Sequence, residues 1–110
     1  MSPSVSTKVF IACGATDMRK GFGGLQALVE GVLKQDSISG HWFIFCNERK
    51  TTLKILYWDG SGFWVCAKRL ERGRFSFPQE GKESMTHGEL GCLLSGIEIN
   101  EKNFKKWRRM

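Results

Sequence analysis

The residues best suited to chemistry are basic side chains clustered near the middle of the chain. Positions 68–74 read Lys-Arg-Leu-Glu-Arg-Gly-Arg, with four cations around a single carboxylate. A turn projects such side chains outward, and its glycine lets a phosphate backbone approach closely. The run therefore indicates a turn that contacts an anion or a protein partner, or else a hairpin tip held together by salt bridges.

Aromatic residues lie among these cations, at Tyr57, Trp58, Phe63, Trp64, Phe75 and Phe77. Sheets that bind a single nucleic-acid strand stack bases on rings and hold phosphates with cations. Side-chain alternation along strands favours core positions for most of these rings, so the cations are the better candidates. We predict nucleic-acid-binding side chains at Arg49, Lys50, Lys54, Lys68, Arg69, Arg72 and Arg74, and at Lys105, Lys106, Arg108 and Arg109 near the C-terminus.

The net charge of +6 over 110 residues is concentrated in two blocks. Residues 49–74 hold seven basic and two acidic side chains, net +5, and residues 101–110 hold five and one, net +4. Residues 75–100 carry net −3, and residues 1–48 are neutral overall. Two basic blocks on a small chain point to a polyanionic partner, nucleic acid first, with a solvated basic face as the alternative.

Motifs for catalysis are sparse. Glu48-Arg49-Lys50 with Asp36 upstream is similar to the D…E-x-K arrangement of metal-dependent nucleases, but so short a pattern also arises by chance in basic proteins. The chain contains no P-loop, no G-x-S-x-G and no H-E-x-x-H. We therefore predict no catalytic residues, no metal and no cofactor, with a small metal-dependent nuclease as an alternative.

The four cysteines, Cys13, Cys46, Cys66 and Cys92, are scattered, and neither histidine lies near them at zinc-ligand spacing. Thiols in a chain of the cytoplasm are expected to be reduced. Cys46 and Cys66 stand among apolar residues, so we predict that both are free and buried within strands.

The hydrophobic pattern predicts both helices and strands. Apolar residues recur at three- and four-residue steps from Met18 to Leu33, which indicates an amphipathic helix over residues 17–34. The apolar face predicted to pack on a sheet comprises Phe22, Leu25, Leu28, Val29 and Val32. Strands are predicted at residues 7–12, 41–46, 53–58, 63–70 and 74–77, and a short helix after the capping box Thr86-x-x-Glu89.

These elements predict an α+β fold: an antiparallel β-meander of four to five strands packed against one long amphipathic helix, plus a short C-terminal helix. Residues 1–100 would form a single domain, and residues 101–110 a basic C-terminal tail. No run of 18 apolar residues is present, so we expect no membrane contact and a cytoplasmic location.

Several longer stretches resemble one family of transposon proteins. They are Cys13-Gly14-Ala15-Thr16-Asp17-Met18-Arg19-Lys20-Gly21-Phe22, Ser39-Gly40 with Phe43-Ile44-Phe45, Leu53-Lys54-Ile55-Leu56-Tyr57-Trp58-Asp59-Gly60-Ser61-Gly62-Phe63-Trp64, and Lys68-Arg69-Leu70-Glu71-Arg72-Gly73-Arg74-Phe75. The family is the second open-reading-frame product of insertion-sequence-66 type elements, often called TnpB. It is unrelated to the RNA-guided nuclease of the same name. The resemblance covers roughly residues 8–97.

This resemblance implies an accessory protein of bacterial insertion-sequence transposition that binds DNA, the element's transposase, or both. The DNA recombination chemistry is then expected to belong to that separate, larger transposase, and the family supplies no catalytic residues to carry over. The alternative is a protein–protein interaction module of the transposition complex that does not contact DNA. A homo-oligomer is compatible with either interpretation.

The chain departs from the family pattern in one loop that bears on DNA binding. The family's loop after the strand that ends at Phe45 is usually richer in arginine. Four positions of this loop where the family commonly has charged residues are occupied here by Cys46, Glu48, Thr51 and Thr52. Arg49 and Lys50 remain as the cations of this loop.

Overall fold

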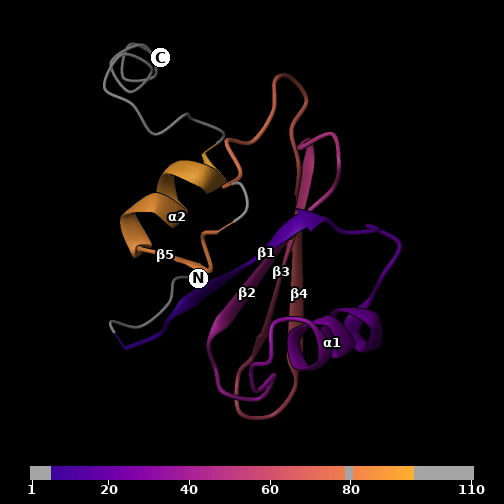
Figure 1. Ribbon diagram of the computed structural model, residues 1–110, viewed down its shortest axis with the longest axis vertical. Helices are drawn as coiled ribbons and strands as arrows, with labels where there is room; N and C mark the ends of the chain where they lie inside the picture. The colour runs from indigo at the N-terminus through magenta and orange to yellow at the C-terminus, as the bar shows by residue number, and fades with distance from the viewer. Residues whose placement is uncertain (1–5, 79–80, 96–110) are drawn as a thin grey trace.

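The computed structural model describes residues 6–78 and 81–95, which build one five-stranded sheet and two helices (Figure 1). The elements in chain order are β1 (Val9–Ala15), α1 (Phe22–Gly31), β2 (Trp42–Cys46), β3 (Thr52–Trp58), β4 (Phe63–Arg69), β5 (Ser84–Met85) and α2 (His87–Leu94). The strands lie across the sheet in the order β4-β3-β2-β1-β5. The α+β class predicted from the sequence is confirmed.

The sheet is mixed, so the prediction of a purely antiparallel meander is wrong. β1 and β2 pair in parallel, with Val9 beside Trp42 and Ile11 beside Ile44, whereas the other neighbouring pairs are antiparallel. The parallel pair follows from the helix between its strands, because parallel neighbours need a crossover connection that a short turn cannot provide. β2, β3 and β4 do follow the predicted meander.

One face of the sheet is covered by α1, which is shorter than the predicted helix. Leu25 and Val29 are fully buried in the cluster between α1 and the sheet, and Leu28 packs at its border. Phe22 and Val32 are 56% and 68% exposed, so their predicted packing is wrong. They are the first residue and the C-cap of a helix of 10 residues.

Local contacts explain why the helix does not extend over 17–34. At its start, the Asp17 carboxylate accepts a hydrogen bond from the Arg19 backbone N–H (2.9 Å), and Lys20 N–H donates to Asp17 O (3.1 Å). An aspartate that bonds its own neighbouring backbone favours a turn over a helix. Beyond the C-terminal end, Lys34 has a φ of +55°, which is incompatible with a right-handed helix.

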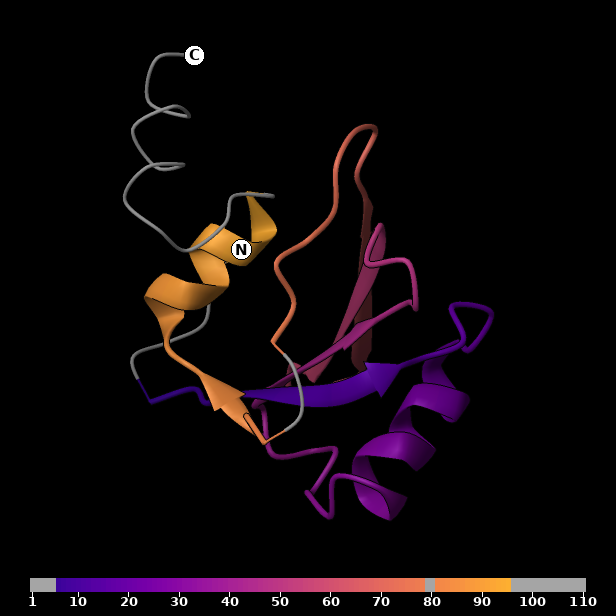
Figure 2. The same ribbon diagram turned by 45° about the horizontal axis from the view of Figure 1, so that its top comes forward.

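The opposite face of the sheet is covered by α2 and by an irregular segment that follows β4 (Figure 2). Phe75 and Phe77 are 2% and 6% exposed and share a core cluster with Leu90 and Leu93 of α2. Residues 74–77 form no strand, so the strand predicted there is wrong. The alternation of aromatic and polar residues reflects burial of the two rings without strand pairing.

The predicted capping box at the start of α2 is confirmed. Thr86 Oγ1 accepts a hydrogen bond from Glu89 N–H, and Glu89 Oε1 accepts one from Thr86 N–H, both at 3.0 Å. These reciprocal bonds satisfy two backbone donors at the helix N-terminus. Neither helix in residues 6–78 and 81–95 is long and apolar enough to cross a bilayer.

Candidate nucleic-acid interface

Three loops meet at one end of the sheet. β1 and β2 are parallel, so both end there, and β3 begins and β4 ends at the same place. Backbone hydrogen bonds join the loops: Thr16 N–H donates to Cys46 O (2.8 Å), and Phe75 N–H donates to Lys50 O (2.7 Å). We call the surface formed by residues 16–21, 47–51 and 69–74 the basic end (Figure 1).

The basic end carries a dense positive charge. Its three loops hold seven basic and three acidic side chains, net +4. Five predicted cations belong to it: Arg49, Lys50, Arg69, Arg72 and Arg74. All of these except the half-buried Lys50 are exposed. The fold thus places side chains from distant parts of the sequence on one surface, where their fields add.

The loop of residues 47–51 is a tight turn organised by Asn47. Its Oδ1 accepts hydrogen bonds from the backbone N–H groups of Thr51 (2.9 Å) and Thr52 (3.1 Å), and its carbonyl accepts one from Lys50 N–H (3.1 Å). Lys50 has a φ of +59°, a conformation that a lysine adopts only where its surroundings hold it. Arg49 is exposed on this turn, so a well-defined loop presents its guanidinium.

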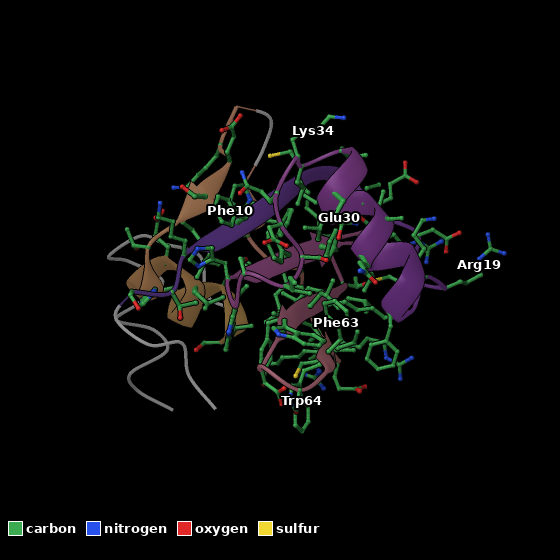
Figure 3. The ribbon with its side chains drawn as sticks, turned by 90° about the horizontal axis from the view of Figure 1, so that it is seen from below. Phe10, Arg19, Glu30, Lys34, Phe63 and Trp64 are labelled. Carbon is green, nitrogen blue, oxygen red and sulfur yellow. The ribbon has the colours of Figure 1, made fainter. Side chains whose placement is uncertain are left out.

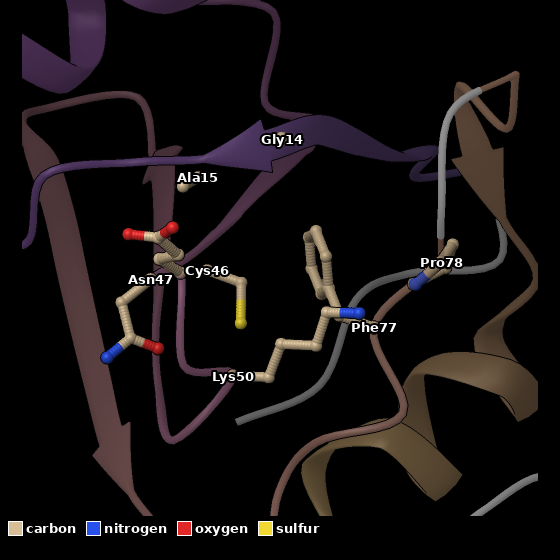
Figure 4. A pocket seen from close by; sticks show the side chains of 8 residues that line it. Gly14, Ala15, Cys46, Asn47, Lys50, Phe77 and Pro78 are labelled. Atoms are coloured by element: carbon tan, nitrogen blue, oxygen red, sulfur yellow. The ribbon is translucent and has the colours of Figure 1, made fainter.

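A pocket of about 380 Å³ opens beside this turn, between the ends of β1 and β2 and residues 77–78 (Figure 4). The Lys50 and Cys46 side chains line it, with Gly14 on the β1 side. Burial raises the pKa of the Cys46 thiol to about 11, against the opposing effect of the nearby Lys50 charge. The thiol is therefore protonated near neutral pH and is a poor nucleophile.

The loop of residues 16–21 adds two cations that the sequence analysis did not select. Arg19 and Lys20 are exposed, and Arg19 extends outward beyond the start of α1 (Figure 3). Arg19 makes a bidentate contact with Asp17, with Nη2 to Oδ2 at 2.7 Å and Nε to Oδ1 at 3.0 Å. Hydrogen bonds from Arg19 lower the pKa of the Asp17 carboxyl. The family motif Thr-Asp-Met-Arg-Lys at residues 16–20 was the one sequence signal that could have selected both residues.

Lys54 lies under this loop, and its ammonium group is held by the protein itself. Lys54 Nζ donates to Met18 O at 2.7 Å and to Lys20 O at 3.0 Å. The side chain is half-buried on the α1 face of β3. Lys54 therefore positions the backbone that carries Arg19 and Lys20, a contribution to the basic end that does not require a phosphate contact.

The loop of residues 69–74 begins at the last residue of β4 and is anchored by its apolar neighbours. Leu70 N–H donates to Thr51 O (2.8 Å), and Phe75 beyond the loop is buried. Among the described residues, Glu71 forms no ion pair with an adjacent arginine. The alternative of a hairpin tip held together by salt bridges around Glu71 is therefore wrong for residues 68–74. Lys68, one strand position earlier, donates from Nζ to Leu94 O at the end of α2.

The residues of the nuclease-like pattern are not brought together. Asp36 precedes β2 and Glu48 follows it, so the length of this strand separates them. Five strand residues span roughly 13 Å or more, which is too far for one metal ion to bind both carboxylates. Within residues 6–78 and 81–95, no group of three His, Cys, Asp or Glu side chains is arranged to hold a metal.

Two other predictions concern residues away from this surface. Cys46 and Cys66 are free, as predicted; Cys46 is 1% exposed in β2, whereas Cys66 is only half-buried in β4. The predicted tail residues Lys105, Lys106, Arg108 and Arg109 lie outside the described residues.

Comparison with known proteins identifies the family. A match to the family described as "IS66 Orf2 like protein" spans residues 7–104. The chain belongs to this family. Relatives of this IS66 Orf2-like chain include two uncharacterized proteins of Sinorhizobium fredii (strain NBRC 101917 / NGR234), named y4hO and y4jC. The first is 40% identical over 95 residues, which cover 84% of this chain and 83% of the relative. The second is 36% identical over 100 residues, covering 89% and 86%.

No solved structure matches the chain. Membership in the IS66 Orf2-like family confirms the resemblance drawn from the sequence motifs and supports an accessory role in transposition. Two of the four motif stretches quoted for that resemblance, residues 13–22 and 68–75, contribute loops to the basic end. A third, residues 53–64, contributes Lys54, which bonds to the backbone of the first loop.

Proposed function

We propose that this IS66 Orf2-like protein is a non-catalytic accessory subunit of transposition that binds the phosphate backbone of DNA through its basic end. The observation that carries the proposal is the convergence of three loops with net +4 at one end of the sheet. Exposed guanidinium groups suit phosphate oxygens, because their planar fork makes paired hydrogen bonds. The element's own transposase is the protein partner that we propose for the assembled complex.

The character of the surface supports backbone binding over sequence reading. Its cations stand on loops, apart from Arg69 at the last position of β4, and none of its three loops is a helix or a two-stranded ribbon of the kind that enters the major groove. Phosphate contacts fix position and orientation without selecting a sequence. The bases would then be read by the transposase, and this protein would add affinity.

The salt dependence of binding tests the proposal directly. With about four to six phosphate contacts, log K should fall with log salt at a slope of roughly −3.5 to −5.5 on duplex DNA. The double variant Arg49→Gln/Arg72→Gln removes two exposed cations of the basic end, and the slope should become shallower by about 1.8. The matched control, Lys8→Gln/Lys34→Gln, removes two exposed cations at the other end of the sheet and should leave the slope unchanged.

A different result would indicate that the basic end binds a protein partner. If the parent protein shows no DNA binding at low salt, or an affinity that does not change with salt, the proposal fails. The protein-interaction alternative then predicts that the transposase co-purifies with the parent, and that Arg49→Gln/Arg72→Gln abolishes this without any DNA present.

A further inference from the structure

β4 is an open edge of the sheet. Within residues 6–78 and 81–95 it pairs with β3 alone, through seven consecutive register positions without a bulge. The strand contains no proline, and its charged residues are confined to its last two positions. Edge strands of this kind expose a row of backbone donors and acceptors that can pair with another chain.

The pairing with β3 determines which backbone groups face outward. Asp59 N–H donates to Gly62 O (3.0 Å) at one end of the hairpin, and Leu70 N–H donates to Thr51 O (2.8 Å) at the other. Hydrogen-bonded pairs alternate along an antiparallel ladder, so even-numbered residues of β4 bond to β3. The N–H and C=O groups at the free edge therefore belong to Phe63, Val65, Ala67 and Arg69.

We propose that β4 pairs antiparallel with β4 of a second copy of this chain, around a two-fold axis at Cys66. The free N–H and C=O groups of one β4 must lie opposite those of the other β4 to form hydrogen bonds. If most of the strand is to pair, the two-fold axis therefore has to pass through Val65, Cys66 or Ala67. Only the axis at Cys66 matches all seven residues, Phe63 with Arg69 and Val65 with Ala67. The two sheets would then continue as one, independently of whether the basic end binds DNA.

The side chains of this register are complementary. Trp42, Tyr57 and Trp64 stack across β2, β3 and β4, with centroids 5.1 and 6.3 Å apart and interplanar angles of 18° and 11°. Trp64 is 50% exposed, and its Nε1 donates to Asp59 Oδ2 (2.7 Å), which fixes the ring. One face of this ring stacks on Tyr57 of β3, so the other faces away from β3, beyond the outermost strand.

The next layer of the stack would be the aliphatic stem and ammonium of Lys68 of the second copy, whose Nζ donates to Leu94 O of its own chain on this same face of the sheet. Adjacent strands lie about 4.8 Å apart, which places the lysine side chain within the roughly 6 Å needed for a cation–π contact. Arg69 lies opposite Phe63 of the second copy in the same way. Like charges are kept apart, because the two Lys68 positions are four residues, or about 13 Å, from each other along the ribbon. This complementarity favours a second copy over an unrelated strand.

Cross-linking through Cys66 tests the register. Its two copies would form a non-hydrogen-bonded pair, with Cα atoms about 4.5 Å apart, within the range that a disulfide spans. In a Cys13→Ser/Cys92→Ser background, copper-phenanthroline oxidation should convert the protein rapidly to a disulfide-linked dimer. Adding Cys66→Ser should abolish the product, because the remaining Cys46 is buried.

A cysteine at the neighbouring position is the matched control. Ala67 is exposed, so Cys66→Ser/Ala67→Cys detects random collision as well as a shifted axis. It should cross-link much more slowly than Cys66. Faster cross-linking at position 67 than at position 66 would overturn the proposed register.

Sedimentation velocity tests the dimer without oxidation. The parent of 12.5 kDa should sediment with twice the monomer mass. Ala67→Pro removes an outward N–H that β3 does not use and should restore the monomer, whereas Ala67→Ser should remain dimeric. Circular dichroism shows whether each variant is folded. A parent that is monomeric at its highest attainable concentration, or an Ala67→Pro variant that folds and still dimerises, would overturn the proposal.

Discussion

Lys54 offers the most direct test of how the basic end is built. Its ammonium group donates two hydrogen bonds to backbone carbonyls, those of Met18 and Lys20, across 36 and 34 positions of sequence. Lys54→Met retains most of the aliphatic side chain and removes both bonds. Hydrogen bonds from charged groups contribute about 1.5–3 kcal/mol each. The bond to Lys20 O is solvent-exposed and should contribute little, so we expect the loss of the part-buried bond to Met18 O alone, about 2 kcal/mol.

This loss is measurable by equilibrium unfolding. For a domain of this size, about 1 kcal/mol corresponds to roughly 4–8 °C in Tm, so Lys54→Met should melt roughly 8–16 °C below the parent. Hydrogen exchange at the Lys20 amide, which bonds Asp17 O, should also accelerate. Lys20→Met is the matched control on the same loop. Lys20 is exposed, so its replacement should change stability by no more than about 0.5 kcal/mol.

The DNA-binding slope separates this role from the phosphate contact predicted from the sequence. If Lys54 contacts a phosphate, its loss makes the salt slope shallower by about 0.9 with no loss of stability. If Lys54 only positions the loop of residues 16–21, its loss destabilises the protein and weakens DNA binding because Arg19 and Lys20 are displaced. If Lys54→Met unfolds like Lys20→Met and makes the slope shallower, the structural role is refuted and Lys54 binds DNA directly.

Two further predictions concern the opposite face of the sheet. Phe75→Ala should destabilise the protein by about 3–5 kcal/mol in urea unfolding, because the ring is 2% exposed although its segment is not a strand; a loss comparable to that of a surface substitution would contradict its place in the core. The Lys82 ammonium and Thr86 N–H hold the pKa of Glu89 below its ordinary value of 4.5, so this carboxylate stabilises the fold above that pH and loses the effect as pH falls through the lowered value. Glu89→Gln should therefore lower the free energy of unfolding near neutral pH and flatten its decline in acid, and a decline as steep as the parent's would show that other groups cause it.

The sequence predicted the antiparallel half of the sheet well because its signals are local. Runs of aromatic and branched residues separated by turn-forming clusters placed β2, β3 and β4 within a residue or two of their observed bounds. β1 was located, but its pairing was not. All five residues of β2 are buried, and a continuously apolar strand is typical of one covered on both faces, as parallel strands are. The continuously apolar sequence of β2 could therefore have indicated a parallel pairing with β1 through the α1 crossover.

The site was less predictable, because it depends on strand direction. Cations at positions 19, 49 and 72 become neighbours only when β1 and β2 are parallel and β4 ends beside the start of β3. Charge counting selected residues 49–74 as a block, although Lys54 within this block bonds to the protein's own carbonyls. The 17–21 segment was assigned to a helix, where Arg19 and Lys20 would have pointed in different directions. Its actual turn depends on contacts from Lys54, far along the chain.

The concentration of cations at one end of the sheet also has a kinetic consequence. The other end of the sheet carries Asp36 and Asp59 in its loops against Lys8 and Lys34, so these charges cancel there. A molecule with such an asymmetric charge experiences a torque in the field of a polyanion, which turns its positive end toward the polyanion before contact. Oriented encounters raise the association rate constant, and ionic screening removes this gain with a Debye length near 10 Å at 0.1 M salt. Under the proposed function, the association rate constant with DNA should therefore depend on salt as well as the equilibrium affinity.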